Sequence, residues 1–231
     1  MWLICSSIGR KLVMSISGTA LMLFLLFHGA MNLVSVISPE GYNTICGILG
    51  ANWYALVATA GLAFLVAVHF VYALVLSIQN YLSRGFKRYS VKDAPKDVSW
   101  QSRNMLLLGA IIIGFLLLHL YNFWFKMQFA ELTGIHTGAF DPHDGAAYVQ
   151  ALFANPVYGG LYLIWLVALW LHLTHGIWSA LQSMGLNNTV WMQRIKCISK
   201  IVATFIVLMF AVVVVYYTWL AYYTNSFAFN W

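Results

Sequence analysis

The sequence predicts an all-α membrane protein, a single domain spanning 1–231 in which five transmembrane helices form a bundle. Of its 231 residues 62% are hydrophobic and only 8% are charged, whereas a soluble domain carries about 25% charged residues. Crossing about 30 Å of hydrocarbon takes about 20 helical residues. Five apolar stretches are long enough, at approximately 12–36, 53–82, 104–128, 156–184 and 200–223. Backbone groups in lipid must be satisfied within their own segment, and the alternating pattern of a barrel is absent, so we expect helices.

The first stretch follows Arg10 and Lys11, an arrangement that also begins a secretory signal. The apolar run from 12 to 36 is too long for the core of a signal peptide, and no small-residue cleavage site precedes a soluble domain. We therefore expect a retained first transmembrane helix.

The connections fall at about 37–52, 83–103, 129–155 and 185–199. The third connection predicts a short helix with Asp141 as its cap, Pro142 in its first turn and an apolar face over 148–153. Asn155 and Pro156 should interrupt the chain before the fourth span, because the residue before a proline disfavours helical backbone.

Charge predicts the orientation. With the N-terminus inside, eleven of the twelve basic residues lie on the inner side and only Lys126 lies outside, while four of the six acidic residues lie outside. Basic residues collect in cytoplasmic loops, so the N-terminus should be cytoplasmic and the aromatic, uncharged C-terminal segment 216–231 should lie at the outer interface. This distribution explains the net charge of +6 better than a nucleic-acid partner does.

Each of the first four spans contains a histidine at a similar distance from its start. The spacings are 17 residues from Lys11 to His28 and 16 residues from Trp53 to His69, from Arg103 to His119 and from Pro156 to His172. At about 1.5 Å per residue each imidazole lies roughly 24–26 Å along its helix. Helices one and three start inside and helices two and four start outside, so depth pairs His28 with His119 near the outer face and His69 with His172 near the inner face.

Two pairs of imidazoles within a helical bundle favour two haem irons, each held between two histidines. The alternative is that each histidine hydrogen-bonds between helices, but four at two matched depths are hard to obtain by chance. His175 lies one turn from His172 and is expected to hydrogen-bond or relay protons. Cys5, Cys46 and Cys197 are scattered and no C-x-x-C-H occurs, so the haems should be of b type, and any iron–sulphur cluster belongs to another subunit.

Other residues are candidates for the haem surroundings. Gly18 and Gly176 lie within spans, where a flat macrocycle or another helix can approach. Haem propionates need donors at the membrane edge, and the inner candidates are Arg10, Lys11, Ser15, Arg84, Arg88 and Arg103. The basic residues of this set are also explained by the excess of Lys and Arg expected on the cytoplasmic side of a membrane protein. His136 and His143, in the outer loop beside acidic residues, fit solvated loop residues better than a metal site.

Several motifs together resemble a known family. They are Ser6-Ser7-Ile8-Gly9-Arg10-Lys11, Ser15-x-x-Gly18, His28 followed by Asn32-Leu33, His119-Leu120-Tyr121 and His172-x-x-x-Gly176-Ile177-Trp178. With five spans and four histidines, the chain resembles the single-chain, two-haem cytochrome b subunit of succinate:quinone oxidoreductases, the succinate dehydrogenase and fumarate reductase family. The resemblance covers nearly the whole chain and supports His172 over His175 as the ligand.

The resemblance implies a membrane anchor in a bacterial inner membrane, with His28 and His119 holding the distal haem and His69 and His172 the proximal haem. It implies an iron–sulphur subunit docked on the basic inner loops, a flavoprotein (FAD) subunit that handles succinate or fumarate, and electron transfer to menaquinone near the outer face. It places Ser15 near the proximal propionates. It leaves open whether the complex is a dimer of heterotrimers.

The menaquinone site is the least defined part of this prediction. Family members often carry a carboxylate near the outer end of helix two. This chain has no acidic residue there, and the nearest candidates are Glu40, Tyr42 and Asn43 in the preceding loop, together with Asn32. The position of a glutamate proposed to carry protons in some members is Trp170 here, so that path is not expected. Two other functions remain: a two-haem cytochrome b of a hydrogenase, formate dehydrogenase or nitrate reductase, and a haem-free proton-coupled transporter.

Overall fold

The computed structural model describes residues 6–83, 99–135, 137–186 and 188–224, and all regular secondary structure in this part of the chain is helical. The prediction of five membrane-spanning helices is confirmed. They are α2 (Ser7–Ile37), α4 (Trp53–Ser83), α6 (Met105–His119), α9 (Pro156–Ser183) and α10 (Met192–Tyr223). A π-helical turn, η1 (Leu120–Trp124), extends α6, and the short helices are α3 (Pro39–Ile48), α5 (Trp100–Arg103), α7 (Gln128–Thr133) and α8 (Gly145–Phe153).

Polar residues in the sequence set where several helices begin. The Ser6 side chain accepts a hydrogen bond from the Gly9 amide at 2.9 Å and caps α2. Ser38 caps α3 in the same way, with Pro39 in the first turn, and Asn155 caps α9 immediately before Pro156. Serine and asparagine satisfy amides that the first helical turn leaves free, and proline lacks an amide, so these residues fit these positions.

Several features differ from the sequence-based expectation. Helix α2 begins at Ser7 rather than near 12, and Pro142 lies before α8 rather than in its first turn. Helix α10 begins at Met192 rather than near 200, because its first turns are helical but too basic to count as apolar. Helix α3, within the 37–52 connection, was not expected. The cap of α8 is Asp144 rather than Asp141: Asp144 Oδ1 accepts the Ala147 amide at 3.1 Å, whereas Asp141 Oδ1 accepts the His143 amide at 2.8 Å and closes a turn before the helix. The expected apolar face of this short helix is buried.

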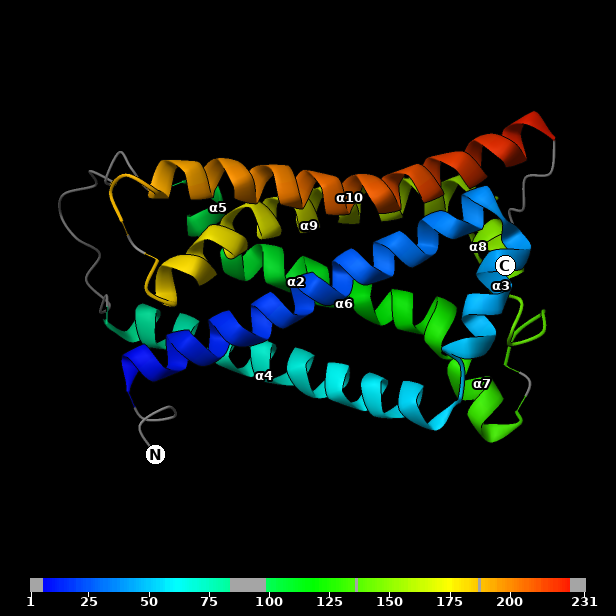
Figure 1. Ribbon diagram of the computed structural model, residues 1–231, viewed down its shortest axis with the longest axis horizontal. Coiled ribbons are helices and arrows are strands. Elements are labelled where there is room, and N and C mark those ends of the chain that lie inside the picture. The colour runs from blue at the N-terminus through cyan, green and yellow to red at the C-terminus, as the bar shows by residue number, and fades with distance from the viewer. Residues whose placement is uncertain (1–5, 84–98, 136, 187, 225–231) are drawn as a thin grey trace.

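The tightly packed core lies on one side of the bundle. Helix α10 runs along α9 and α2, and α8 closes one end of this core (Figure 1). By contrast, α4 buries only Ala55 and α6 buries only Leu108 among their described residues. Helix α4 packs mainly on α2 and meets α6 at few points. The four histidines of the spans lie on α2, α4, α6 and α9, so two of them are on helices of this core, α2 and α9, and two are on the less buried helices α4 and α6.

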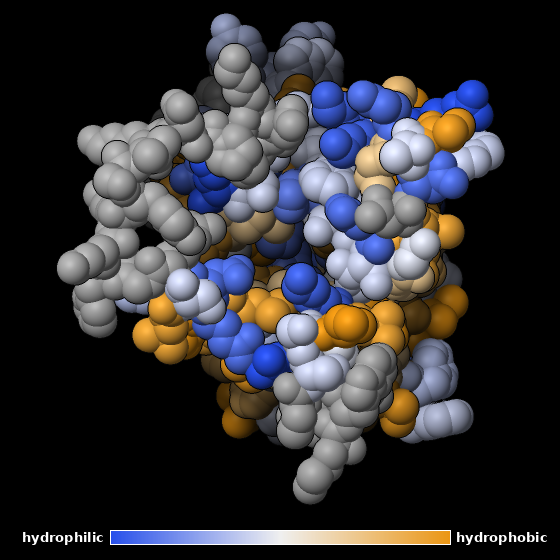
Figure 2. Space-filling view, turned by 90° about the vertical axis from the view of Figure 1, so that its left-hand side faces the viewer, coloured by the Kyte–Doolittle hydropathy of each residue, from blue (hydrophilic) through white to orange (hydrophobic). Residues whose placement is uncertain are grey.

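The two ends of the bundle differ in charge. We call the end with α5, the start of α2 and the start of α10 the α5 end, and the opposite end, with α3, α7 and α8, the α8 end (Figure 1). Figure 2 shows the α5 end, where hydrophilic residues gather toward the middle of the face. In the described ranges the α5 end carries Arg10, Lys11, Arg103, Arg194, Lys196 and Lys200, while Glu40, Glu131, Asp141 and Asp144 lie at the α8 end.

Candidate functional site

The structure brings the four histidines together as two pairs, in the combination that the depth argument predicts. The ring centroids of His28 and His119 are 5.8 Å apart with their planes at 85°. Those of His69 and His172 are 6.3 Å apart with their planes at 67°. The second pair contacts α2 at Ser17, eleven residues before His28, so the pairs are separated by about 16 Å along the bundle.

The first pair lies toward the α8 end in an aromatic environment. The ring of Phe24 stacks on His28 at 5.2 Å, and Phe210 approaches it at 5.6 Å. His119 has Phe123 at 5.1 Å and Trp165 at 5.8 Å. These side chains keep water away and leave few polar partners for the two imidazoles.

The second pair lies toward the α5 end against two small residues of α2. Ser17 Oγ is 3.3 Å from His69 Nδ1. A Cβ on Gly18 would lie 3.1 Å from His69 Cε1 and 3.4 Å from its Nδ1, closer than an unstrained contact of 3.5–4.0 Å. The His69 ring thus occupies the space that any larger residue at position 18 would need.

The geometry of both pairs fits one iron between two imidazoles. Imidazole nitrogens bind metals at about 2 Å, so two such ligands on opposite sides of one iron have ring centres about 6 Å apart, close to both measured separations. The Nδ1 atoms of His119 and His172 are buried without a hydrogen-bond partner, so both imidazoles still have bonding capacity inside the membrane. In the described ranges no three His, Cys, Asp or Glu side chains cluster as a metal cage. A haem would need two imidazoles from the protein, because its macrocycle supplies the other ligands, and each pair offers two.

His175 does not belong to either pair. Its ring is 4.8 Å from that of Trp178 in an edge-to-face contact, and its Nδ1 is buried without a hydrogen-bond partner. The neighbouring Gly176 has no atom within 4 Å of the position of a Cβ. Gly176 is therefore not a close helix–helix contact, whereas Gly18 is a close contact with His69.

The other candidates at the α5 end are spread around the start of α2. Ser15 is buried, and its Oγ donates to the Lys11 carbonyl at 2.8 Å. Arg10 has a buried Nε without a hydrogen-bond partner, while Lys11 is exposed. Arg103 ends α5 and is exposed. Arg84 and Arg88 lie outside the described residues. Of this set, Arg10 has the donor best suited to an anionic group.

The four quinone-site candidates separate into two groups. The Tyr42 hydroxyl donates to Asn32 Oδ1 at 3.2 Å, and Asn32 Nδ2 donates to the His28 carbonyl at 2.8 Å, so these two residues form a polar line to the first pair. Asn43 instead joins α3 to α8, through Asp144 Oδ1 at 2.8 Å and the backbone of that helix. Glu40 is exposed in the first turn of α3.

Two polar residues beside the pairs were not singled out from the sequence. One is Ser17, next to His69. The other is Asn122, in the π-helical turn directly after His119, which is buried, donates to the Tyr162 hydroxyl at 3.2 Å and has an unpartnered Oδ1. Such turns are rare and are frequent at functional sites. The signal available in the sequence was an asparagine within an apolar run.

The segment from α7 to the start of α8 contains a separate ionic cluster. His143 Nδ1 lies 3.0 Å from Asp141 Oδ1, and its Nε2 lies 3.2 Å from Glu131 Oε1. Glu131 Oε2 also accepts the Ala51 amide at 2.9 Å, which ties α7 to the start of α4. The hydrogen bond that His143 donates to the Asp141 carboxylate, followed by the charge of Glu131, raises the pKa of His143 above its usual value. His136 lies outside the described residues.

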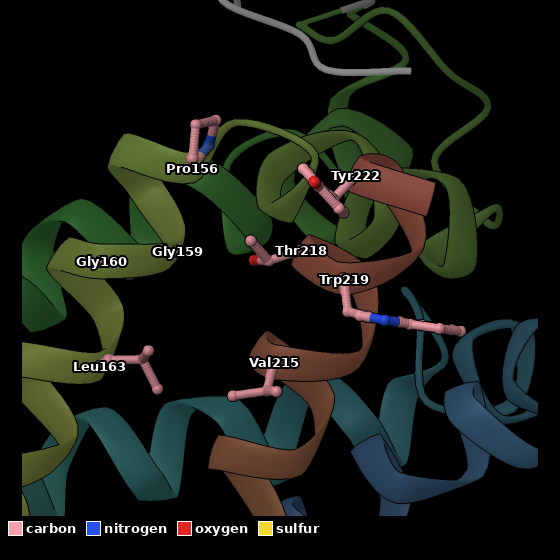
Figure 3. A pocket seen from close by; sticks show the side chains of 8 residues that line it. All are labelled: Pro156, Gly159, Gly160, Leu163, Val215, Thr218, Trp219 and Tyr222. Atoms are coloured by element: carbon pink, nitrogen blue, oxygen red, sulfur yellow. The ribbon is translucent and has the colours of Figure 1, made fainter. Parts of the chain in front are cut away.

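A surface groove of about 480 Å³ lies between the start of α9 and the end of α10 (Figure 3). Gly159 and Gly160 are among the residues that line it, and Leu163, Val215 and Trp219 give it an apolar lining. None of the paired histidines lines it. The groove is therefore separate from the two pairs.

No protein-family model, no curated protein and no solved structure matches this chain.

Proposed function

We propose that this chain is the di-haem cytochrome b membrane anchor of a succinate:quinone oxidoreductase, carrying electrons between an iron–sulphur subunit and membrane menaquinone. The observation that carries the proposal is the pair of facing histidines at each of two depths, contributed by four different spans. A set of hydrogen-bonding histidines has no need of matched pairs with a spacing of about 6 Å.

In this proposal His28 and His119 hold one b haem and His69 and His172 hold the other. When bound, the haems supply one-electron transfer at a fixed position. The protein residues hold each imidazole at a set depth, and the aromatic side chains around His28 and His119 exclude water. A neutral imidazole is the form that binds a metal.

The charge distribution supports the orientation that we propose. Because basic residues remain on the cytoplasmic side, the α5 end faces the cytoplasm of a bacterial cell and the α8 end faces outward. The iron–sulphur subunit, and through it the FAD-containing flavoprotein, then docks at the basic α5 end. Menaquinone reacts near the α8 end, where Asn32 and Tyr42 provide hydrogen-bonding groups beside His28.

The proposal is tested by isolating the chain from native membranes with an affinity tag on its C-terminus. We expect two further subunits, one with FAD and one with iron–sulphur clusters, and a b-haem absorbance that succinate reduces. Haem reduction by hydrogen or formate but not by succinate would indicate that the chain serves another dehydrogenase. A preparation without haem would favour the proton-coupled transporter instead.

A further inference from the structure

We infer that Ser17 is the positioning residue of His69, fixing which imidazole nitrogen is free to bind iron; the inference rests on the proposed haem function. Ser17 lies on α2 and is almost fully buried, at 2% exposure. Its Oγ makes two contacts, at 3.1 Å with the Met14 carbonyl and at 3.3 Å with His69 Nδ1.

The two contacts of Ser17 together determine the proton positions. A serine hydroxyl has one proton and two lone pairs. The Met14 carbonyl can only accept, and it also lies within hydrogen-bond reach of the His69 ring. With the hydroxyl proton of Ser17 on that carbonyl, the Oγ is an acceptor toward His69, and in this arrangement His69 Nδ1 carries the proton. The lone pair of the neutral imidazole is therefore on Nε2.

This proton arrangement is the one that ligation through Nε2 requires. A metal-bound histidine commonly donates its other ring N–H to an oxygen, which fixes the tautomer and the ring orientation and makes the ligand more basic. Gly18 acts with Ser17, because the absence of a side chain there allows the His69 ring to lie against α2.

The four paired histidines differ in this respect. His28 Nδ1 lies 3.4 Å from an amide nitrogen, Asn32 Nδ2, which cannot accept a proton. The Nδ1 atoms of His119 and His172 have no partner. Within the part of the chain that the structure describes, His69 is thus the paired histidine whose Nδ1 faces a side-chain acceptor. We expect the haem on His69 to have the more electron-rich ligand and a lower midpoint potential than the same haem without Ser17.

The test uses the full chain carrying Ser17→Ala, with redox titration and electron paramagnetic resonance of the bound haems. We expect the potential of one haem to rise and its low-spin signal to change, while the other haem is unaffected. Haem retention at the changed site should weaken, by about 10-fold or more if Ser17 behaves like other residues that support a metal ligand. Ser17→Thr keeps the hydroxyl and should restore the wild-type potential.

Ser199→Ala is the matched control. Ser199 is also fully buried and its Oγ donates to a carbonyl of its own helix, Ile195 at 2.7 Å, but it lies on α10. Loss of a buried hydroxyl as such would affect both variants equally. A shift confined to Ser17→Ala supports the positioning role.

The failure of this inference is distinguishable from the failure of the proposed function. Two haems with wild-type potentials and signals in Ser17→Ala would overturn the role of Ser17 and leave the haem function standing. Absence of haem from the wild-type protein would overturn both. A second readout needs no haem: nitrogen NMR of the haem-free chain, with His69→Gln to assign the signal, should show the proton of His69 on Nδ1, and a proton on Nε2 would contradict the inference.

Discussion

Gly18 gives the sharpest prediction, because the structure shows what a side chain there would displace. The Cβ of an alanine would lie 3.1 Å from His69 Cε1, so the ring would have to move by about 0.5 Å to reach ordinary contact. The two γ-carbons of a valine would enter the space of the ring itself. Overpacking of this kind costs about 1–3 kcal/mol, and it falls on a proposed haem ligand. We therefore expect Gly18→Val to lose one of two haems and to unfold at lower temperature.

Gly160→Val is the matched control for this experiment. Gly160 lies in a membrane-spanning helix, α9, with no atom within 4 Å of its Cβ position, so the same substitution should change stability by only about 0.5 kcal/mol. Haem is counted by the pyridine haemochrome method, and unfolding is followed by circular dichroism in detergent. If Gly18→Val kept both haems with unchanged potentials and unfolded with the control, the placement of His69 against Gly18 would be wrong.

Three further predictions concern residues outside the haem pairs. Tyr162→Phe leaves the buried Asn122 amide without its acceptor and should lower the unfolding free energy by about 1 kcal/mol. The double variant with Asn122→Leu should recover most of this loss. If the losses of the two single variants simply added in a detergent unfolding series, the prediction would be contradicted. The raised pKa of His143 means that its contacts stabilise the segment between α7 and α8 fully below about pH 6.5 and lose this effect as pH rises through the folded-state pKa. Proton NMR should place that pKa above 6.5 and lower it in Asp141→Ala, and an unchanged value in the variant would refute the pairing. Asp144→Ala removes the cap of α8 and should lower the unfolding free energy by about 1 kcal/mol. At pH 8, where His143 is neutral, this loss should exceed that of Asp141→Ala. Equal melting temperatures of the two variants would contradict the cap assignment.

The spans could be predicted from the sequence because lipid imposes a strict requirement. Any backbone in hydrocarbon must satisfy its own hydrogen bonds, so the length of an apolar run fixes the helix. The same regularity, a rise of about 1.5 Å per residue, turns sequence spacing into depth. Depth then predicts which histidines lie together, and the structure has His28 beside His119 and His69 beside His172.

The side-chain contacts depend on the rotation of each helix about its axis and on packing, and the spacing of residues in the sequence contains neither. Ser15 and Ser17 are two residues apart on α2, and only the rotation of the helix relative to α4 decides that Ser17 contacts His69. Asp141 and Asp144 are both plausible caps in sequence, and the choice follows from where Asn43 of α3 lies. Helix α3 itself escaped prediction because its 10 residues are too few to span a membrane and its first turn contains Pro39 and Gly41, residues that are typical of turns.

The most direct test of the central claim is the number of haems per chain in the purified wild-type protein, with alanine at each of the four paired histidines. The account predicts two low-spin b haems per chain. His28→Ala and His119→Ala should lose the same haem, and His69→Ala and His172→Ala the other. No haem in the wild-type protein, or variants of one pair that lose different haems, would contradict it.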